Sequence, residues 1–131
     1  SVIIVRDTET TAKIYFDGVD QGSPDSTSGT LSGDTLFQYI GNNYSSNSQF
    51  FEGNIDEVAG WNSDKSASVS AIYNSGTPTD LTSLSPLGWW RMGEHGTWDG
   101  SNWTFTDQGS GSNDGTSVNM IEADRSTDVP T

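Results

Sequence analysis

The chain has 131 residues, of which 18 are acidic and 5 are basic, so its formal net charge is −13 at pH 7. Such a surface repels the phosphates of nucleic acids and of anionic lipids, which argues against both as partners. The absence of cysteine excludes a structural disulfide and a cysteine-based zinc site, and no apolar run reaches the ~20 residues that would predict membrane insertion.

The first third of the chain predicts short strands joined by polar turns. Strands are expected at residues 2–5, 13–16, 19–22 and 35–40. The run at 2–5 is apolar throughout, as in a central strand. Asp17-Gly18 is a tight-turn pair and predicts a hairpin, whereas the Ser/Thr/Gly-rich stretch at 23–33 predicts a surface loop.

The middle of the chain predicts a strand, a turn and one short helix. Phe51, Ile55, Ala59 and Trp61 alternate as on one face of a strand, but Val58 breaks the period. We therefore expect either a bulge near Asp56-Glu57 or a strand that is covered on both faces. Downstream, the apolar positions Val69, Ile72 and Tyr73 predict a helix near 66–74, with Gly76 as its stop.

The last third predicts a connector at 77–86 and further short strands. Strands are expected at 87–92, 103–106 and 117–121, with a loop at 95–102 and a glycine-rich turn at 108–115. Trp61, Trp89 and Trp90 have strand-like contexts and are expected in the core. Because Trp89 and Trp90 are adjacent, one ring should face inward and the other should face outward or lie against another chain.

Three motifs resemble the concanavalin A-like lectin/glucanase family, of the laminin-G and pentraxin-like kind. The segment at 50–74, FFEGNIDEVAGWN followed by AIYN, resembles a late strand and helix of that family. AKIYFDG at 12–18 and YIGN at 39–42 resemble its earlier strands, in the right order. The resemblance implies an all-β fold: a concanavalin A-like jelly-roll β-sandwich with one short helix.

A second resemblance concerns the domain organisation. Residues 88–94 and 106–116 resemble the opening of a laminin-G-like domain, yet in this chain they follow the closing motifs. Either the chain ends one domain and begins another, or 87–121 supplies the usual first strands of a single permuted domain over 1–131. We favour the single domain because 131 residues leave little room for two cores. The permuted arrangement requires contacts between the two segments.

The carboxylates of the middle segment argue against catalysis. Glucanases of the resembled fold carry Glu-x-Asp-x-x-Glu, which places two carboxylates about 5–5.5 Å apart across one bond in a retaining enzyme. In this chain Asn54 takes the middle position, and Asp56-Glu57 has the wrong spacing. We expect no enzyme activity, and we expect Asp56 or Glu57 to cap backbone or to pair with a base such as Arg91. The single histidine, His95, does not suggest a transition-metal site.

Two groups of loop residues are candidate binding residues. Amide and aromatic side chains in or beside polar loops suggest stacking and hydrogen bonding to a sugar, with rings exposed on the loops. These ligand-binding candidates are Asn42, Asn43, Tyr44, Asn47, Trp98 and Trp103. Oxygen-bearing side chains in the glycine-rich turn suggest calcium as the one candidate cofactor, although simple turns use the same residues. These metal candidates are Asp107, Asn113 and Asp114.

We therefore expect a non-enzymatic module that recognises carbohydrate or another protein surface. The last third of the chain carries GWWRMGE at 88–94, TDQGSGSNDGT at 106–116 and DVP at 128–130, and with these motifs it resembles segments of structural proteins of marine bacteriophages. That resemblance implies an extracellular or virion-surface location, in a fibre or a capsid decoration, with other structural subunits or self-association as partners. The alternatives are a purely structural display subunit, held by protein contacts without a ligand, and a cellular surface adhesin.

Overall fold

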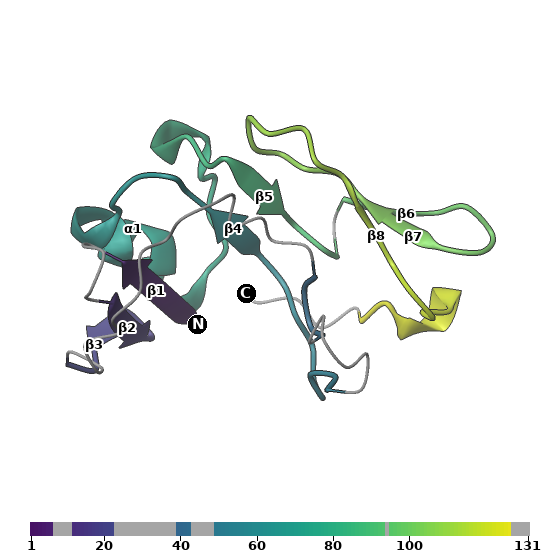
Figure 1. The fold of residues 1–131 in the computed structure, drawn as a ribbon, viewed down its shortest axis with the longest axis horizontal. Coiled ribbons are helices and arrows are strands. Elements are labelled where there is room, and N and C mark those ends of the chain that lie inside the picture. Colours follow the sequence, from purple (N-terminus) through teal and green to yellow (C-terminus); the bar gives the residue numbers. More distant parts are fainter. Residues whose placement is uncertain (7–11, 23–38, 43–48, 94, 127–131) are drawn as a thin grey trace.

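The computed structural model describes residues 1–6, 12–22, 39–42, 49–93 and 95–126. In this part of the chain the strands are β1 (Val2–Arg6), β2 (Ala12–Phe16), β3 (Val19–Asp20), β4 (Val58–Gly60), β5 (Gly88–Trp90), β6 (Gly96–Trp98), β7 (Trp103–Phe105) and β8 (Gly115–Thr116), and the α-helix is α1 (Val69–Tyr73). All strand pairs are antiparallel. The predicted all-β fold with one short helix is thus confirmed (Figure 1). The loop predicted at 23–33 lies outside the described residues, as does most of the strand predicted at 35–40.

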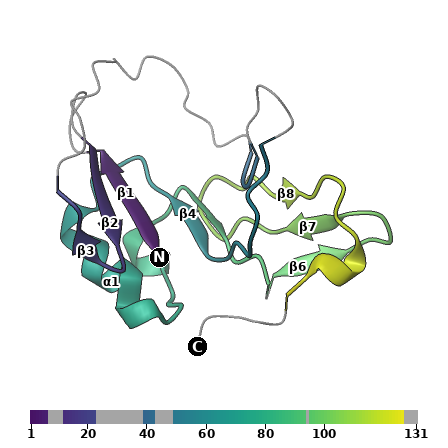
Figure 2. The ribbon, with the colours of Figure 1, turned by 90° about the horizontal axis from the view of Figure 1, so that it is seen from below.

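The strands form three small sheets, ordered β1-β2-β3, β4-β5 and β6-β7-β8. The first and third sheets lie at opposite ends of the molecule, with β4-β5 between them (Figure 1). Figure 2 shows α1 lying against one face of the first sheet. There Val5, Tyr15 and Val69 form a buried cluster, with Ile3 packed against it. Burial of these side chains joins the helix to the sheet because it removes their apolar surface from water.

The opposite face of the first sheet is apolar and exposed. Val2, Ile4, Phe16 and Val19 are 50–67% exposed. The expectation of a central strand at 2–5 is wrong for the described residues, because β1 lies at an edge of its sheet and only alternate side chains are buried. The Asp17-Gly18 hairpin is confirmed. Both residues have positive φ, 49° and 75°, as the right-handed twist of a two-residue hairpin requires.

The helix is confirmed near its predicted position. Single 3-10 turns at Ser66–Ser68 and Asn74–Gly76 flank α1. The helix ends before the predicted stop at Gly76, because Asn74 and Ser75 already take left-handed φ angles of 43° and 57°. Tyr73 lies so close to the hairpin turn that a Cβ on Gly18 would be 2.8 Å from its ring. Glycine at position 18 therefore serves both the turn and the helix contact.

The strand predicted over 51–61 is much shorter in the structure. Only Val58–Gly60 pairs with β5, and Phe51, which the alternation places in the core, is 60% exposed. Glu57 has a φ of 52°, so the extended backbone is interrupted at this residue. This is the position at which a bulge was one of the two expectations. Trp89 and Trp90 are both buried, at 4% and 7% exposure. The expectation that one of them faces outward is wrong, because β5 is covered on both sides.

The third sheet differs from expectation at both of its edges. β6 occupies part of the stretch predicted as a loop at 95–102, and it pairs Trp98 with Trp103 of β7. The last strand is Gly115–Thr116 instead of 117–121. Beyond it, the Ser117 N–H still donates to the Trp103 carbonyl at 2.8 Å, while the Ser117 hydroxyl accepts the Trp103 backbone N–H at 2.8 Å.

The two C-terminal segments that resemble a domain opening contact each other. The backbone N–H of Trp89 donates to Asp107 Oδ1 at 2.8 Å, and that of Gln108 donates to the Trp89 carbonyl at 2.7 Å. Gly111 donates to the Leu87 carbonyl at 2.7 Å. Since β5 also pairs with β4, these contacts meet the requirement of the permuted arrangement. The single permuted domain itself stays a prediction.

Candidate functional site

A cleft with a volume of about 950 Å³ lies between two segments that are distant in sequence. Residues 39–42 and 50–56 form one wall, and residues 113–120 and 124–126 form the other. The floor includes Trp90, Met92, Trp103 and Phe105. The lining combines aromatic and aliphatic side chains with amides, carboxylates and a guanidinium, so the cleft can offer a ligand both apolar contact and hydrogen bonds.

Aromatic rings stand on the first wall of the cleft. Tyr39 is 49% exposed, and Phe50 and Phe51 are each 60% exposed. This wall is held by the pairing of Asn42 with Phe50 and by a 2.8 Å hydrogen bond from the Phe51 N–H to the Gly41 carbonyl. Exposed rings beside a cleft are available for stacking on a ligand. Sequence reasoning did not propose these rings as binding residues, because it assigned Phe51 to the inner face of a strand and Tyr39 to the strand predicted at 35–40.

β6 and β7 carry a row of packed rings, of which Trp103 and Phe105 line the cleft and Trp98 does not. The Trp103 ring lies 5.6 Å from that of Trp98 and 6.5 Å from that of Phe105, centroid to centroid. Gly96 makes room for this row, because a Cβ there would lie 3.2 Å from atoms of both Trp103 and Phe105. Trp103 is 5% exposed, and its indole N–H donates to the Ile121 carbonyl at 3.2 Å. Trp103 is therefore a fixed part of the floor.

The predicted ligand-binding residues divide into three groups. Asn42 and Trp103 line the cleft, and Trp103 is at the start of a strand as expected, but its ring is buried instead of exposed. Trp98 is on β6, where it packs on Trp103 outside the cleft lining. The remaining three, Asn43, Tyr44 and Asn47, lie outside the described residues.

The predicted calcium residues are brought together in one turn. Asp107 is 8% exposed, and its carboxylate accepts backbone N–H bonds from Trp89, Gly109 and Asn113 at 2.7–2.9 Å. Asp114 Oδ1 in turn accepts the Asp107 N–H at 2.9 Å. These bonds give Asp107 a structural role, since it ties the turn to β5. Across the described ranges no group of three or more His, Cys, Asp or Glu side chains is placed to hold a metal ion, and calcium binding stays a prediction.

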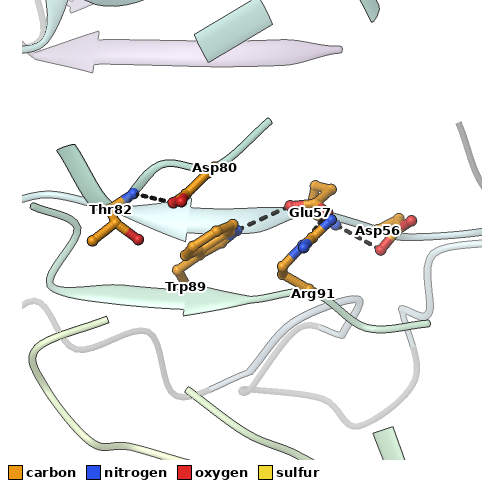
Figure 3. Close-up of polar contacts among 6 residues, drawn as sticks. All are labelled: Asp56, Glu57, Asp80, Thr82, Trp89 and Arg91. Atoms are coloured by element: carbon orange, nitrogen blue, oxygen red, sulfur yellow. Dashed lines mark hydrogen bonds and ion pairs between the residues drawn. The ribbon is translucent and has the colours of Figure 1, made fainter. Parts of the chain in front are cut away.

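Glu57 stands at the centre of a polar cluster beside β4 and β5 (Figure 3). Its Oε1 accepts from Arg91 Nε at 2.7 Å, and its Oε2 accepts from Trp89 Nε1 at 2.9 Å. The Arg91 guanidinium also lies 5.4 Å from the centroid of the Trp89 ring. Asp56 Oδ1 accepts the Glu57 N–H at 2.9 Å. The expected pairing with Arg91 and the expected backbone cap are both confirmed.

Three exposed aspartates outside the cleft accept local hydrogen bonds that lower their pKa. The backbone N–H and then the hydroxyl of Ser66 lower the pKa of Asp64. The side chain and then the N–H of Thr82 lower the pKa of Asp80 (Figure 3). The backbone N–H groups of Asn102 and Ser101 lower the pKa of Asp99. Each bond favours the charged form of the carboxyl group.

Residues 1–69 match the laminin G family model that is described as the concanavalin A-like lectin/glucanases superfamily. The match spans β1 to β4 and ends at the start of α1, so the second wall of the cleft comes from beyond it. No curated protein and no solved structure matches the chain. Among the described residues no helix has the length and apolar character needed to cross a bilayer.

Proposed function

Because the chain belongs to the concanavalin A-like lectin/glucanases superfamily, we propose that it is a non-enzymatic module that binds carbohydrate in the aromatic cleft. The proposal rests on one observation: Tyr39, Phe50 and Phe51 expose about half or more of their surface on one wall of the cleft. Buried rings would need no further explanation. Exposed rings gathered at a hollow are typical of a surface that binds a partner.

The remaining lining suits a sugar. The apolar faces of pyranose rings pack on aromatic rings, and their hydroxyl groups need hydrogen-bond partners when they leave water. Asn42, Asn54 and Asn119 line the same cleft and carry amides that both donate and accept hydrogen bonds. A cleft with rings on one side and amides nearby meets both needs.

The geometry around Glu57 supports binding without hydrolysis. Both of its carboxylate oxygens accept hydrogen bonds from β5 and the adjacent Arg91, at 2.7 and 2.9 Å. A glycosidase needs one carboxyl group that can exchange a proton with the leaving oxygen and a second that attacks or activates water. Glu57 is held in an ion pair instead, and Asp56 caps the adjacent backbone. Laminin-G-like domains are generally binding modules.

The proposed location is outside the cell, where domains of this family typically occur. Within that setting we propose a place on a virion surface, as a fibre or capsid-decorating protein, on the strength of the resemblance at 88–116. A purely structural subunit would bind no glycan and would be retained by contacts with other subunits. A glycan screen therefore separates the two.

The test is a glycan array followed by affinity measurement on two variants. Phe50→Ala and Phe51→Ala should each weaken the best glycan roughly tenfold, as expected for one lost stacking contact of about 1–1.5 kcal/mol. Phe16→Ala is the matched control, because Phe16 is 50% exposed on β2 and does not line the cleft. Loss of affinity in the control alone, or no glycan retained by the unaltered protein, would contradict the proposal.

A further inference from the structure

The cleft carries an excess of negative charge. Among the described residues that line it, the charged ones are Asp56, Asp114, Asp124 and Arg125. The lining thus carries three carboxylates and one guanidinium, within a chain whose formal net charge is −13. Charges of one sign in a hollow with apolar walls focus the electrostatic potential there. The cleft is therefore a region of negative potential lined with aromatic rings.

Each of these carboxylates is oriented by a backbone N–H group. Asp56 Oδ1 accepts from Glu57 at 2.9 Å, Asp114 Oδ1 accepts from Asp107 at 2.9 Å, and Asp124 Oδ2 accepts from Ile121 at 2.8 Å. A hydrogen bond of this kind restricts the side chain that accepts it. The negative groups are thereby held in place on both walls of the cleft.

The single positive group among the described lining residues is turned toward the floor. The Arg125 guanidinium lies over the Trp103 ring, 5.9 Å from its centroid. Guanidinium groups that stack on a ring in this way bury part of their surface against it. Arg125 therefore offsets the three carboxylates only in part.

We propose that the cleft selects carbohydrates by charge and takes an oligosaccharide that carries protonated amino groups, such as a glucosamine oligomer. The inference rests on the proposed function and deepens it. An ammonium group gains twice, from the carboxylates and from the faces of the exposed rings of Tyr39, Phe50 and Phe51. A uronate or sulfate group meets like charge at the same place and is rejected.

The test compares three oligosaccharides of equal length by calorimetry: a glucosamine oligomer, its N-acetylated form and a galacturonate oligomer. A slightly acidic buffer keeps the amino groups of the sugar protonated. We expect the glucosamine oligomer to bind roughly tenfold more tightly than the N-acetylated form, the galacturonate oligomer not to bind, and the first difference to shrink with added salt.

Two isosteric variants locate the effect. Asp124→Asn keeps an acceptor for the Ile121 N–H and removes one charge, so it should weaken binding of the glucosamine oligomer roughly three- to tenfold and binding of the N-acetylated form clearly less. Asp64→Asn is the control, because Asp64 also accepts a backbone N–H, at 2.8 Å, and lies outside the cleft lining. An equal effect of both variants would show that only the net charge matters, and it would overturn the inference.

The remaining outcomes separate the two proposals. Equal affinity for the amine and N-acetyl forms overturns the charge selection and leaves carbohydrate binding standing. No binding of any of the three oligosaccharides, in a protein that also binds nothing on the glycan array, overturns the proposed function itself. A lysine tetrapeptide serves as the non-sugar cation. If it binds as tightly as the glucosamine oligomer, the assignment to a sugar is overturned.

Discussion

Replacement of Glu57 by alanine should destabilise the protein by about 3 kcal/mol, because its carboxylate satisfies two donors at once. Each hydrogen bond to a charged group contributes roughly 1.5–3 kcal/mol. The side chains of Glu57 and Arg91 are only 18% and 24% exposed, and Trp89 is 4% exposed. Arg91 can regain some water after the change, whereas the Trp89 indole N–H cannot. The expected loss in the free energy of unfolding is therefore that of one fully buried hydrogen bond plus part of a second.

Urea unfolding followed by tryptophan fluorescence measures this loss. With a denaturant slope of about 2 kcal/mol/M, the midpoint should fall by about 1.5 M. Glu52→Ala is the control, since Glu52 is exposed and its loss should change stability by less than about 0.5 kcal/mol. The double variant Glu57→Ala/Arg91→Met should lose about 1–2 kcal/mol less stability than the sum of the losses in the two single variants. A Glu57→Ala midpoint within about 0.3 M of the unaltered protein would refute the reasoning.

Four further predictions concern other parts of the chain. Gly88→Ala should cost about 1–3 kcal/mol in the same unfolding assay, because its Cβ would run into the Trp90 ring; an unchanged midpoint would contradict the packing described for β5. Asp107→Asn should cost about 2 kcal/mol, since an amide cannot accept all three backbone N–H bonds. Calcium binding at this turn should raise the melting temperature above that of chelated protein, and equal temperatures would count against the site. Finally, stability should fall as the pH drops below about 4, because carboxyl groups whose pKa is lowered by folding stabilise the folded state only while they are ionised. A triple aspartate-to-asparagine variant should lose less stability over this range, and an unchanged acid limb would contradict this origin of the pH dependence; its positions are Asp64, Asp80 and Asp99.

Local signals in the sequence were sufficient where a few neighbouring residues decide the conformation. Asp17-Gly18 requires two positive φ angles, which these residue types adopt readily, and the hairpin follows from that alone. The helix near 66–74 follows from its apolar spacing. The Glu57–Arg91 pair was also predictable, because a charge beside a buried strand needs a partner.

The cleft could not be predicted from the sequence, because it depends on contacts between distant segments. One wall comes from residues 39–42 and 50–56 and the other from beyond residue 112, and neither wall is a regular strand over its length. Period-two patterning assigned Phe51 to a core that does not extend that far. It also missed β6, because a glycine such as Gly96 usually indicates a loop. In the structure Gly96 is in a strand, where its lack of a side chain leaves room for the rings of Trp103 and Phe105.

Any self-association through the exposed outer face of β1-β2-β3 should depend on ionic strength. In dilute buffer the long-range repulsion between copies of net charge −13 holds Val2, Ile4, Phe16 and Val19 of one molecule away from those of another. The range of that repulsion shrinks to about 8 Å at 0.15 M salt and to about 3 Å at 1 M. The apolar residues of this sheet can then come into contact between molecules. High salt should therefore promote association of this protein, whereas it would keep a protein with a wholly polar surface in solution.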